Sequence, residues 1–169
     1  NNGDPIPEIC NCGTNSNSAC TTPGWTFYDC QYSNLSYGRL YIGYTIADSR
    51  NVCPSGWHIA TGNEWTQILD LFVTEYSPTS GMVDISALLS SGSNQSGLSI
   101  LLGGSQGPGG AGWAIGQGQW EKHWYNSGSN TGVFQFNNAT SSLPQSGINM
   151  GNNNFTGTWN YNYVRCVKD

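Results

Sequence analysis

The most regular pattern of apolar positions along the chain begins just after residue 61. Four large apolar side chains recur there at the three- and four-residue spacing of one helix face: Trp65, Ile68, Leu69 and Phe72. Thr61 and Glu64 stand at the N-cap and N3 positions of a capping box, in which each residue satisfies a backbone N–H group of the other. The pattern predicts an amphipathic helix over residues 62–75 with Trp65 in the core.

The other apolar segments are shorter. Alternating large residues predict a strand over residues 39–46 that runs into a short helix, and a second helix is expected from Asp84 as N-cap through Leu88 and Leu89 to Gly92. Beyond residue 92 the pattern predicts short strands at 98–102, 133–136 and 161–167, joined by long loops. The glycine-rich stretch 103–118 contains Trp113 and Ile115, so we expect it to pack onto the domain.

Composition limits the architecture to one domain of ordinary size. The chain has 169 residues, of which 9% are charged, and it contains seven Trp and nine Tyr. In a typical globular domain, about a quarter of all residues are charged. We therefore expect aromatic side chains to form the core and turns to connect the elements, rather than long charged helices. The length of the chain is sufficient for an independent core.

Charge excludes two classes of partner. The formal net charge is -5, and the five basic residues are dispersed along the sequence: Arg39, Arg50, Lys122, Arg165 and Lys168. Nucleic acids and anionic membrane surfaces both require a concentrated positive footprint, so neither is expected to bind. No apolar run approaches the roughly 20 residues that span a bilayer, and we expect no membrane insertion. The sequence has the character of a mature, processed product.

Six cysteines offer two kinds of chemistry. Four of them lie in the first 30 residues, Cys10, Cys12, Cys20 and Cys30, and two lie farther along, Cys53 and Cys166. A zinc site would require closely spaced cysteine pairs or nearby histidines, and the spacing here favours disulfides and an oxidising compartment. The four N-terminal cysteines are expected to form two bridges, and three connectivities are open.

The segment Cys53-Pro-Ser-Gly-Trp-His58, continued by Thr61, Glu64 and Trp65, resembles the major paralogous domain first described in Fibrobacter and widespread in secreted Bacteroidota proteins. Gly38-Arg-Leu-Tyr41, Ser96-Gly-Leu-Ser-Ile-Leu-Leu-Gly-Gly104 and Tyr163-Val-Arg-Cys-Val-Lys-Asp169 follow the expected order. The resemblance covers residues 37–169. It departs from the family pattern at Ala60-Thr61, where a Pro-Thr pair is usual.

The resemblance implies an α+β, C-type-lectin-like fold with two helices flanking a small twisted antiparallel sheet, long loops, and Cys53 bonded to Cys166. We therefore expect two parts, a Cys-rich segment at 1–36 and a lectin-like domain at 37–169. In related calcium-dependent lectins, acidic residues in the loops bind the ion. Here residues 122–168 contain no Asp or Glu, so we expect no calcium site, no other metal and no cofactor.

The sequence also shows no evident set of catalytic residues. The chain has two histidines: His58 precedes the predicted helix and is interpreted as structural, whereas His123 follows Glu121 and could form a polar pair with it. No nucleophile, paired carboxylate or metal cluster accompanies either histidine in the sequence. We therefore expect the chain not to be an enzyme.

The second half of the chain is rich in aromatic and amide side chains, the combination favoured in binding surfaces. Trp124 and Trp159 are expected in the core, and Tyr125, Phe155 and Tyr161 at the surface. The predicted ligand surface spans residues 104–130 and 144–163. The residues expected to contact the ligand are Tyr125, Asn126, Asn153, Asn154, Phe155, Asn160 and Tyr161.

These features together predict an extracellular or cell-surface module that binds a glycan or a protein receptor without calcium, as part of a larger surface, pilus or phage-tail assembly. Two alternatives stay open. The chain could be a structural surface domain without its own ligand, or its loops could be diversified by a retroelement, because the Asn/Tyr/Ser-rich segment before the final Val-Arg-Cys is compatible with adenine mutagenesis.

Overall fold

The computed structural model describes residues 5–10, 21–76, 88–90, 94, 97–107, 114–126, 131–137, 148–153 and 160–169. The strands in chain order are β1 (Trp25–Thr26), β2 (Leu40–Ile42), β3 (Trp57–Ile59), β4 (Ser105–Gln106), β5 (Ala114–Ile115), β6 (Trp120–Asn126), β7 (Thr131–Asn137), β8 (Ile148–Asn153), β9 (Tyr161–Val164) and β10 (Cys166–Lys168). The helical elements are α1 (Gly62–Tyr76) and the 3₁₀ turns η1 (Tyr28–Cys30), η2 (Tyr32–Tyr37) and η3 (Gly43–Thr45).

The helix predicted at 62–75 is confirmed as α1, and its capping box is formed. The Glu64 N–H donates to Thr61 Oγ1 at 3.2 Å, and the Thr61 N–H donates to Glu64 Oε2 at 2.7 Å. Trp65 is fully buried and stacks on Phe134 of β7, with ring centroids 4.5 Å apart. Helix α1 is therefore fixed to the sheet by its first turn.

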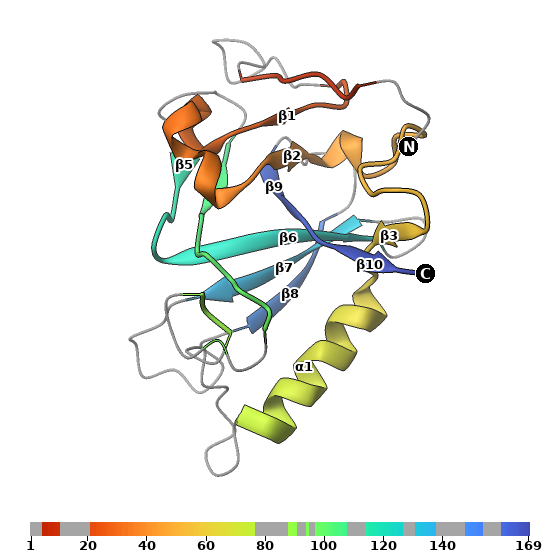
Figure 1. The fold of residues 1–169 in the computed structure, drawn as a ribbon, viewed down its shortest axis with the longest axis vertical. Coiled ribbons are helices and arrows are strands. Elements are labelled where there is room, and N and C mark those ends of the chain that lie inside the picture. Colours follow the sequence, from red (N-terminus) through yellow and green to blue (C-terminus); the bar gives the residue numbers. More distant parts are fainter. Residues whose placement is uncertain are drawn as a thin grey trace.

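Most strands belong to one eight-stranded sheet with the order β1-β2-β9-β6-β7-β8, to which β4 and β5 are added beside β9. All neighbours are antiparallel except β6 and β9, which run parallel. Strands β3 and β10 form a separate two-stranded sheet near the start of α1 (Figure 1). The central strand β9 thus joins an upper part, β1 and β2, to a lower part, β6 to β8.

The expected lectin-like arrangement, with two helices flanking a small antiparallel sheet, is wrong. The sheet is large and mixed, and α1 is the one α-helix in the part of the chain that the structure describes. Of the predicted second helix, residues 84–87 and 91–93 lie outside the described residues. Leu88 and Ser90 instead exchange backbone hydrogen bonds with Ile100, so Leu89 is in a β-bridge. Cross-strand pairing satisfies the backbone that a helix would have satisfied internally.

Other strand predictions are confirmed in part. The strand expected at 39–46 is β2 followed by the 3₁₀ turn η3, and the segments at 133–136 and 161–167 lie in β7, β9 and β10. Residues 98–102 contribute only the bridge at Ile100. Within the glycine-rich stretch, β4 and β5 pair with each other, whereas Trp113 lies outside the described residues.

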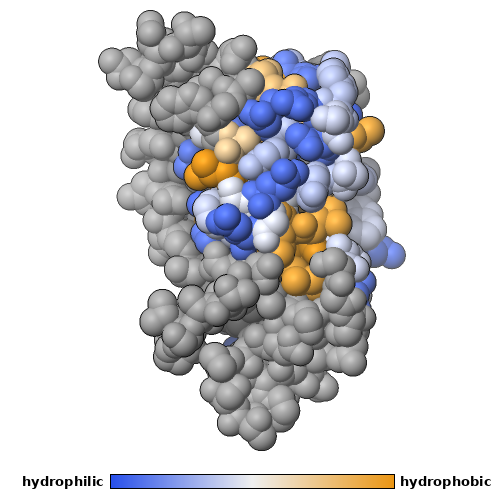
Figure 2. Space-filling view, turned by 90° about the vertical axis from the view of Figure 1, so that its left-hand side faces the viewer, coloured by the Kyte–Doolittle hydropathy of each residue, from blue (hydrophilic) through white to orange (hydrophobic). Residues whose placement is uncertain are grey.

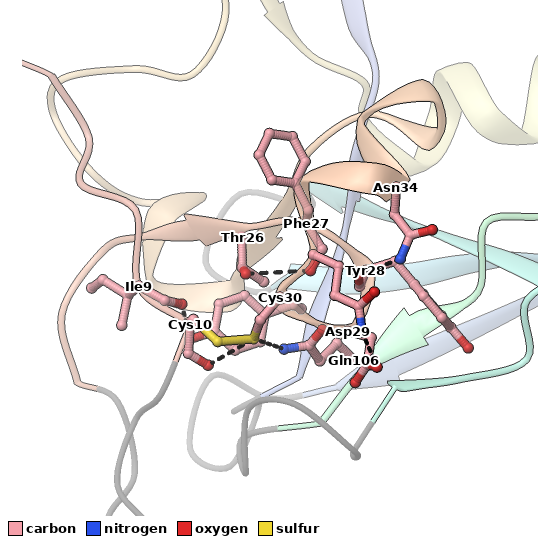
Figure 3. Close-up of a disulfide and its surroundings, with 11 residues drawn as sticks. Ile9, Cys10, Thr26, Phe27, Tyr28, Asp29, Cys30, Asn34 and Gln106 are labelled. Carbon is pink, nitrogen blue, oxygen red and sulfur yellow. Dashed lines mark hydrogen bonds between the residues drawn. A yellow bond between two sulfur atoms is a disulfide. The ribbon is translucent and has the colours of Figure 1, made fainter.

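Cys53 is bonded to Cys166, as the resemblance implies, and the pair is separated by 113 residues in the sequence. In the chain-entropy account, closing a loop of this size stabilises the fold by about 5 kcal/mol. Of the N-terminal cysteines, Cys10 is bonded to Cys30 (Figure 3), whereas Cys12 and Cys20 lie outside the described residues. One of the two expected N-terminal bridges is thereby confirmed.

The N-terminal segment is attached to the main sheet. The Ile9 N–H donates to the Trp25 carbonyl at 2.7 Å, and Trp25 Nε1 donates to the Ile6 carbonyl at 2.9 Å. Gln106 Nε2 of β4 lies 3.2 Å from Cys30 Sγ, beside the disulfide in Figure 3. The predicted division at residue 36 stays a prediction, but β1 on its N-terminal side pairs with β2 on its C-terminal side.

Candidate functional site

The two tyrosines predicted to contact a ligand are buried, so their expected exposure at the surface is wrong. Tyr125 is 3% exposed and Tyr161 is fully buried. The Tyr125 ring lies so close to Gly132 that a Cβ atom there would overlap it. Tyr161 donates its hydroxyl to the Ile9 carbonyl at 3.0 Å, and burial raises its pKa to about 12, so the hydroxyl stays protonated at neutral pH. Both rings support the core and cannot touch a ligand directly.

The predicted amide residues that the structure describes lie towards two different ends of the sheet. The register places Asn126 and Asn153 at the same end of the lower sheet, on either side of Thr131. Exposed Asn160 precedes β9, which runs parallel to β6, so it lies towards the opposite end. Asn154, Phe155 and Trp159 lie outside the described residues, and Trp124 is fully buried as predicted.

A pocket of about 470 Å³ opens instead where β2 and β9 separate. These strands pair at two positions, Tyr41 with Asn162 and Ile42 with Tyr161. Beyond them β9 continues towards β10, away from β2 (Figure 1). The pocket is lined by the η2–β2 junction, the segment around Leu101, β6 and the end of β9. Its walls are thus built by segments that lie far apart in the sequence.

Glu121 and His123 of β6 form a buried pair on the pocket wall. They are two residues apart, so their side chains share one face of the strand. His123 Nε2 lies 2.6 Å from Glu121 Oε1, and the two side chains are 4% and 6% exposed. Glu121 Oε2 accepts from the N–H groups of Leu101, at 3.0 Å, and Gly103, at 3.3 Å. The polar pair that the sequence suggested is therefore present.

The environment keeps Glu121 ionised. Burial alone would raise the pKa of its carboxyl group, but hydrogen bonds from His123 and the two backbone N–H groups outweigh burial and lower that pKa. An ionised carboxylate only accepts hydrogen bonds, so we infer that Nε2 of His123 carries a proton. The other ring nitrogen, Nδ1, is buried and has no hydrogen-bond partner among the described residues.

Two arginines also line the pocket, and sequence reasoning missed both. The Arg39 guanidinium lies 4.1 Å from the centroid of the Trp25 ring. Arg165 is half-buried and donates from Nη2 to the Leu98 carbonyl at 2.9 Å. Both arginines lie in segments that carry the family resemblance, 38–41 and 163–169. Their place in those segments was the one signal in the sequence that could have identified them as site residues. Only the pairing of β2 with β9 brings them to one site.

The second histidine lies outside the pocket and holds structural elements together. His58 Nδ1 is 2.6 Å from Asp169 Oδ1, and its Nε2 is 2.9 Å from Glu64 Oε1. The bond to Asp169 and then the bond to Glu64 raise the pKa of His58, against a smaller opposing effect of burial. His58 therefore connects β3, the cap of α1 and the end of β10, as the structural interpretation requires.

Figure 2 shows a face on which hydrophilic residues of the described part lie between separate hydrophobic groups. In the same part of the chain, no three His, Cys, Asp or Glu side chains gather as metal ligands. None of the helices described has the length and apolar character to cross a bilayer. The disulfides are compatible with an extracellular domain.

Comparison with known proteins gives the family. No curated protein and no solved structure matches the chain. A family model, that of the Fibrobacter succinogenes major domain, matches residues 1–168, which include the N-terminal cysteines. The chain therefore belongs to the Fibrobacter succinogenes major domain family.

Proposed function

We propose that the chain is an extracellular binding module that holds part of a glycan in the pocket between β2 and β9, without calcium and without catalysis. The observation that supports the proposal is the pocket itself, with a volume of about 470 Å³ and walls that carry tyrosine rings beside charged side chains. Ligand sites in proteins have volumes of roughly 300–1,000 Å³ and combine apolar walls with a few converging polar groups.

The side chains of the pocket suit a sugar. The half-buried Tyr37 and Tyr41 provide rings, while the arginines provide hydrogen-bond donors for hydroxyl or carboxylate oxygens. Tyr163 is 5% exposed and its hydroxyl is enclosed, so it forms the base of the wall rather than a ligand contact. A protein receptor would instead be expected to use a flatter and larger surface.

Binding is favoured over catalysis by the surroundings of the Glu121–His123 pair. A histidine that activates a nucleophile has that nucleophile within hydrogen-bond distance of its free nitrogen. No described side chain, including Ser99 of the pocket, is within that distance of His123 Nδ1. The pair then acts as a support, because Glu121 also holds the backbone of Leu101 and Gly103 at the pocket wall.

A glycan array combined with a pull-down from receptor-bearing cells tests this function. We expect glycan binding that EDTA leaves unchanged. Leu101→Trp should abolish binding by adding bulk to the pocket wall, whereas Leu35→Trp, an exposed leucine that does not line the pocket, should leave it intact. Capture of a protein in the pull-down, without binding to any glycan on the array, would favour the protein-receptor alternative. The absence of binding in both assays would favour a structural domain.

A further inference from the structure

The pocket contains positive charge that the protein does not neutralise. Arg165 is half-buried, and within the described part of the chain its side chain donates a hydrogen bond to one backbone carbonyl, that of Leu98, although a guanidinium group has five N–H donors. Burial lowers the pKa of Arg165, and the Glu121 carboxylate opposes that shift. Among the described residues, neither Arg165 nor Arg39 forms an ion pair with a carboxylate. A partly buried cation without an anion is costly, and an anionic ligand would remove that cost.

Among the described residues, Glu121 is the one carboxylate that lines the pocket, and its oxygens already accept hydrogen bonds. Its two oxygens accept hydrogen bonds from His123, Leu101 and Gly103. Its exposure is 5%, so little of the carboxylate faces the pocket. The accessible charge of the pocket is therefore that of the two guanidinium groups.

The positive pocket stands out against the rest of the chain. The formal net charge is -5, and two of the five basic residues line this pocket. Arg50, another of the five, is paired with Asp48 at 2.7 Å. The global charge repels anions at long range, so any anion binding must come from local contacts at this site.

We propose that the sugar held in the pocket is acidic, and that its anionic oxygen group binds the guanidinium groups of Arg39 and Arg165. This inference rests on the proposed glycan-binding function. Guanidinium groups match carboxylate and sulfate oxygens with paired hydrogen bonds, which a neutral hydroxyl cannot provide. A neutral sugar would leave the half-buried Arg165 without a counter-ion.

Calorimetric titration with matched monosaccharides tests the proposal. Glucuronate is compared with glucose, galacturonate with galactose, and glucose 6-sulfate provides a second anionic group on the same ring. We expect each acidic sugar to bind at least about tenfold more tightly than its neutral partner, because hydrogen bonds to charged groups contribute about 1.5–3 kcal/mol. Arg39→Gln and Arg165→Gln should each remove most of that difference, because they should weaken the binding of the acidic sugars far more than the binding of the neutral ones.

Lys168→Gln is the matched control, since it removes the same charge from an exposed position outside the pocket. Arg165→Lys keeps the charge and serves if the glutamine variant unfolds, and urea unfolding of each variant confirms that it folds. Equal binding of neutral and acidic sugars would overturn the proposal and leave the glycan-binding function standing. Binding of an acidic tripeptide as tightly as glucuronate would overturn the sugar assignment, and no binding of any sugar would refute both proposals.

Discussion

The two ends of the sheet are built differently. In the lower part, β6 and β7 pair at seven positions, and the rings of Trp65, Phe134 and Phe136 close the space between sheet and helix. In the upper part, β2 and β9 pair at two positions, and the chain beyond them lines a pocket with charged groups. Long pairing brings side chains into a continuous core, whereas short pairing lets strands part and leaves room for a ligand.

Buried polar atoms without a partner among the described residues occur in both parts of the sheet. Beside the pocket they are His123 Nδ1 and the Tyr163 hydroxyl, and in the lower part they include Trp65 Nε1 and Thr131 Oγ1. Each such group normally costs about 1–3 kcal/mol. The cost of these atoms is therefore shared by the two parts, and the length of strand pairing is what distinguishes them.

The largest expected effect tests the lower core. Trp65→Ala should destabilise the protein by about 3–5 kcal/mol, because it removes a fully buried ring that stacks on Phe134. Urea unfolding followed by circular dichroism measures the change. Leu71→Ala on the same helix, at a position 55% exposed, should change stability by less than about 0.5 kcal/mol. Similar effects of the two variants would contradict the packing described for α1.

A smaller effect distinguishes two tyrosines of β9. Tyr161→Phe should cost about 1 kcal/mol, since it removes the hydroxyl that donates to the Ile9 carbonyl. Tyr163→Phe should be neutral or stabilising, because its buried hydroxyl has no partner among the described residues. Thermal and urea unfolding of the two variants in parallel gives the comparison. A larger loss for Tyr163→Phe would mean that its hydroxyl does have a partner.

The smallest expected effect concerns His58. Its pKa is raised in the folded protein, so its contribution is fully present below the ordinary histidine pKa of about 6.5 and is lost as pH rises through the raised value. The side chain is 39% exposed, so the contribution should be below about 1 kcal/mol. His58→Gln should remove this part of the pH dependence of unfolding between pH 6 and 8. An unchanged pH profile in the variant would refute the contribution.

Local signals in the sequence predicted local structure. The capping residues Thr61 and Glu64 and the spacing after them predicted α1, because a helix is determined by neighbours three and four positions apart. Strand β6 was missed because Glu121, Lys122 and His123 look too polar for a buried strand. They are tolerated there since Glu121 and His123 satisfy each other.

The placement of the ligand surface failed for a related reason. Amides beside Tyr125 and Tyr161 suggested exposed loops, yet β9 lies in the middle of the sheet and is covered on both faces, so Tyr161, Asn162 and Tyr163 are all buried. A strand of this kind shows no alternation in burial. The pocket could not be predicted, because Arg39 and Arg165 meet only through long-range pairing of β2 with β9.

The two disulfides of the described residues also determine how the chain would respond to tension. A force applied between the ends passes directly from Cys53 to Cys166 and from Cys10 to Cys30, so the residues enclosed by each bridge are not extended. The segment between Cys30 and Cys53 carries the full load, and it contains β2 and Arg39. Arg165 lies within the shielded loop. Pulling would therefore strain one wall of the pocket and spare the other, so mechanical load would change the shape of the pocket through β2.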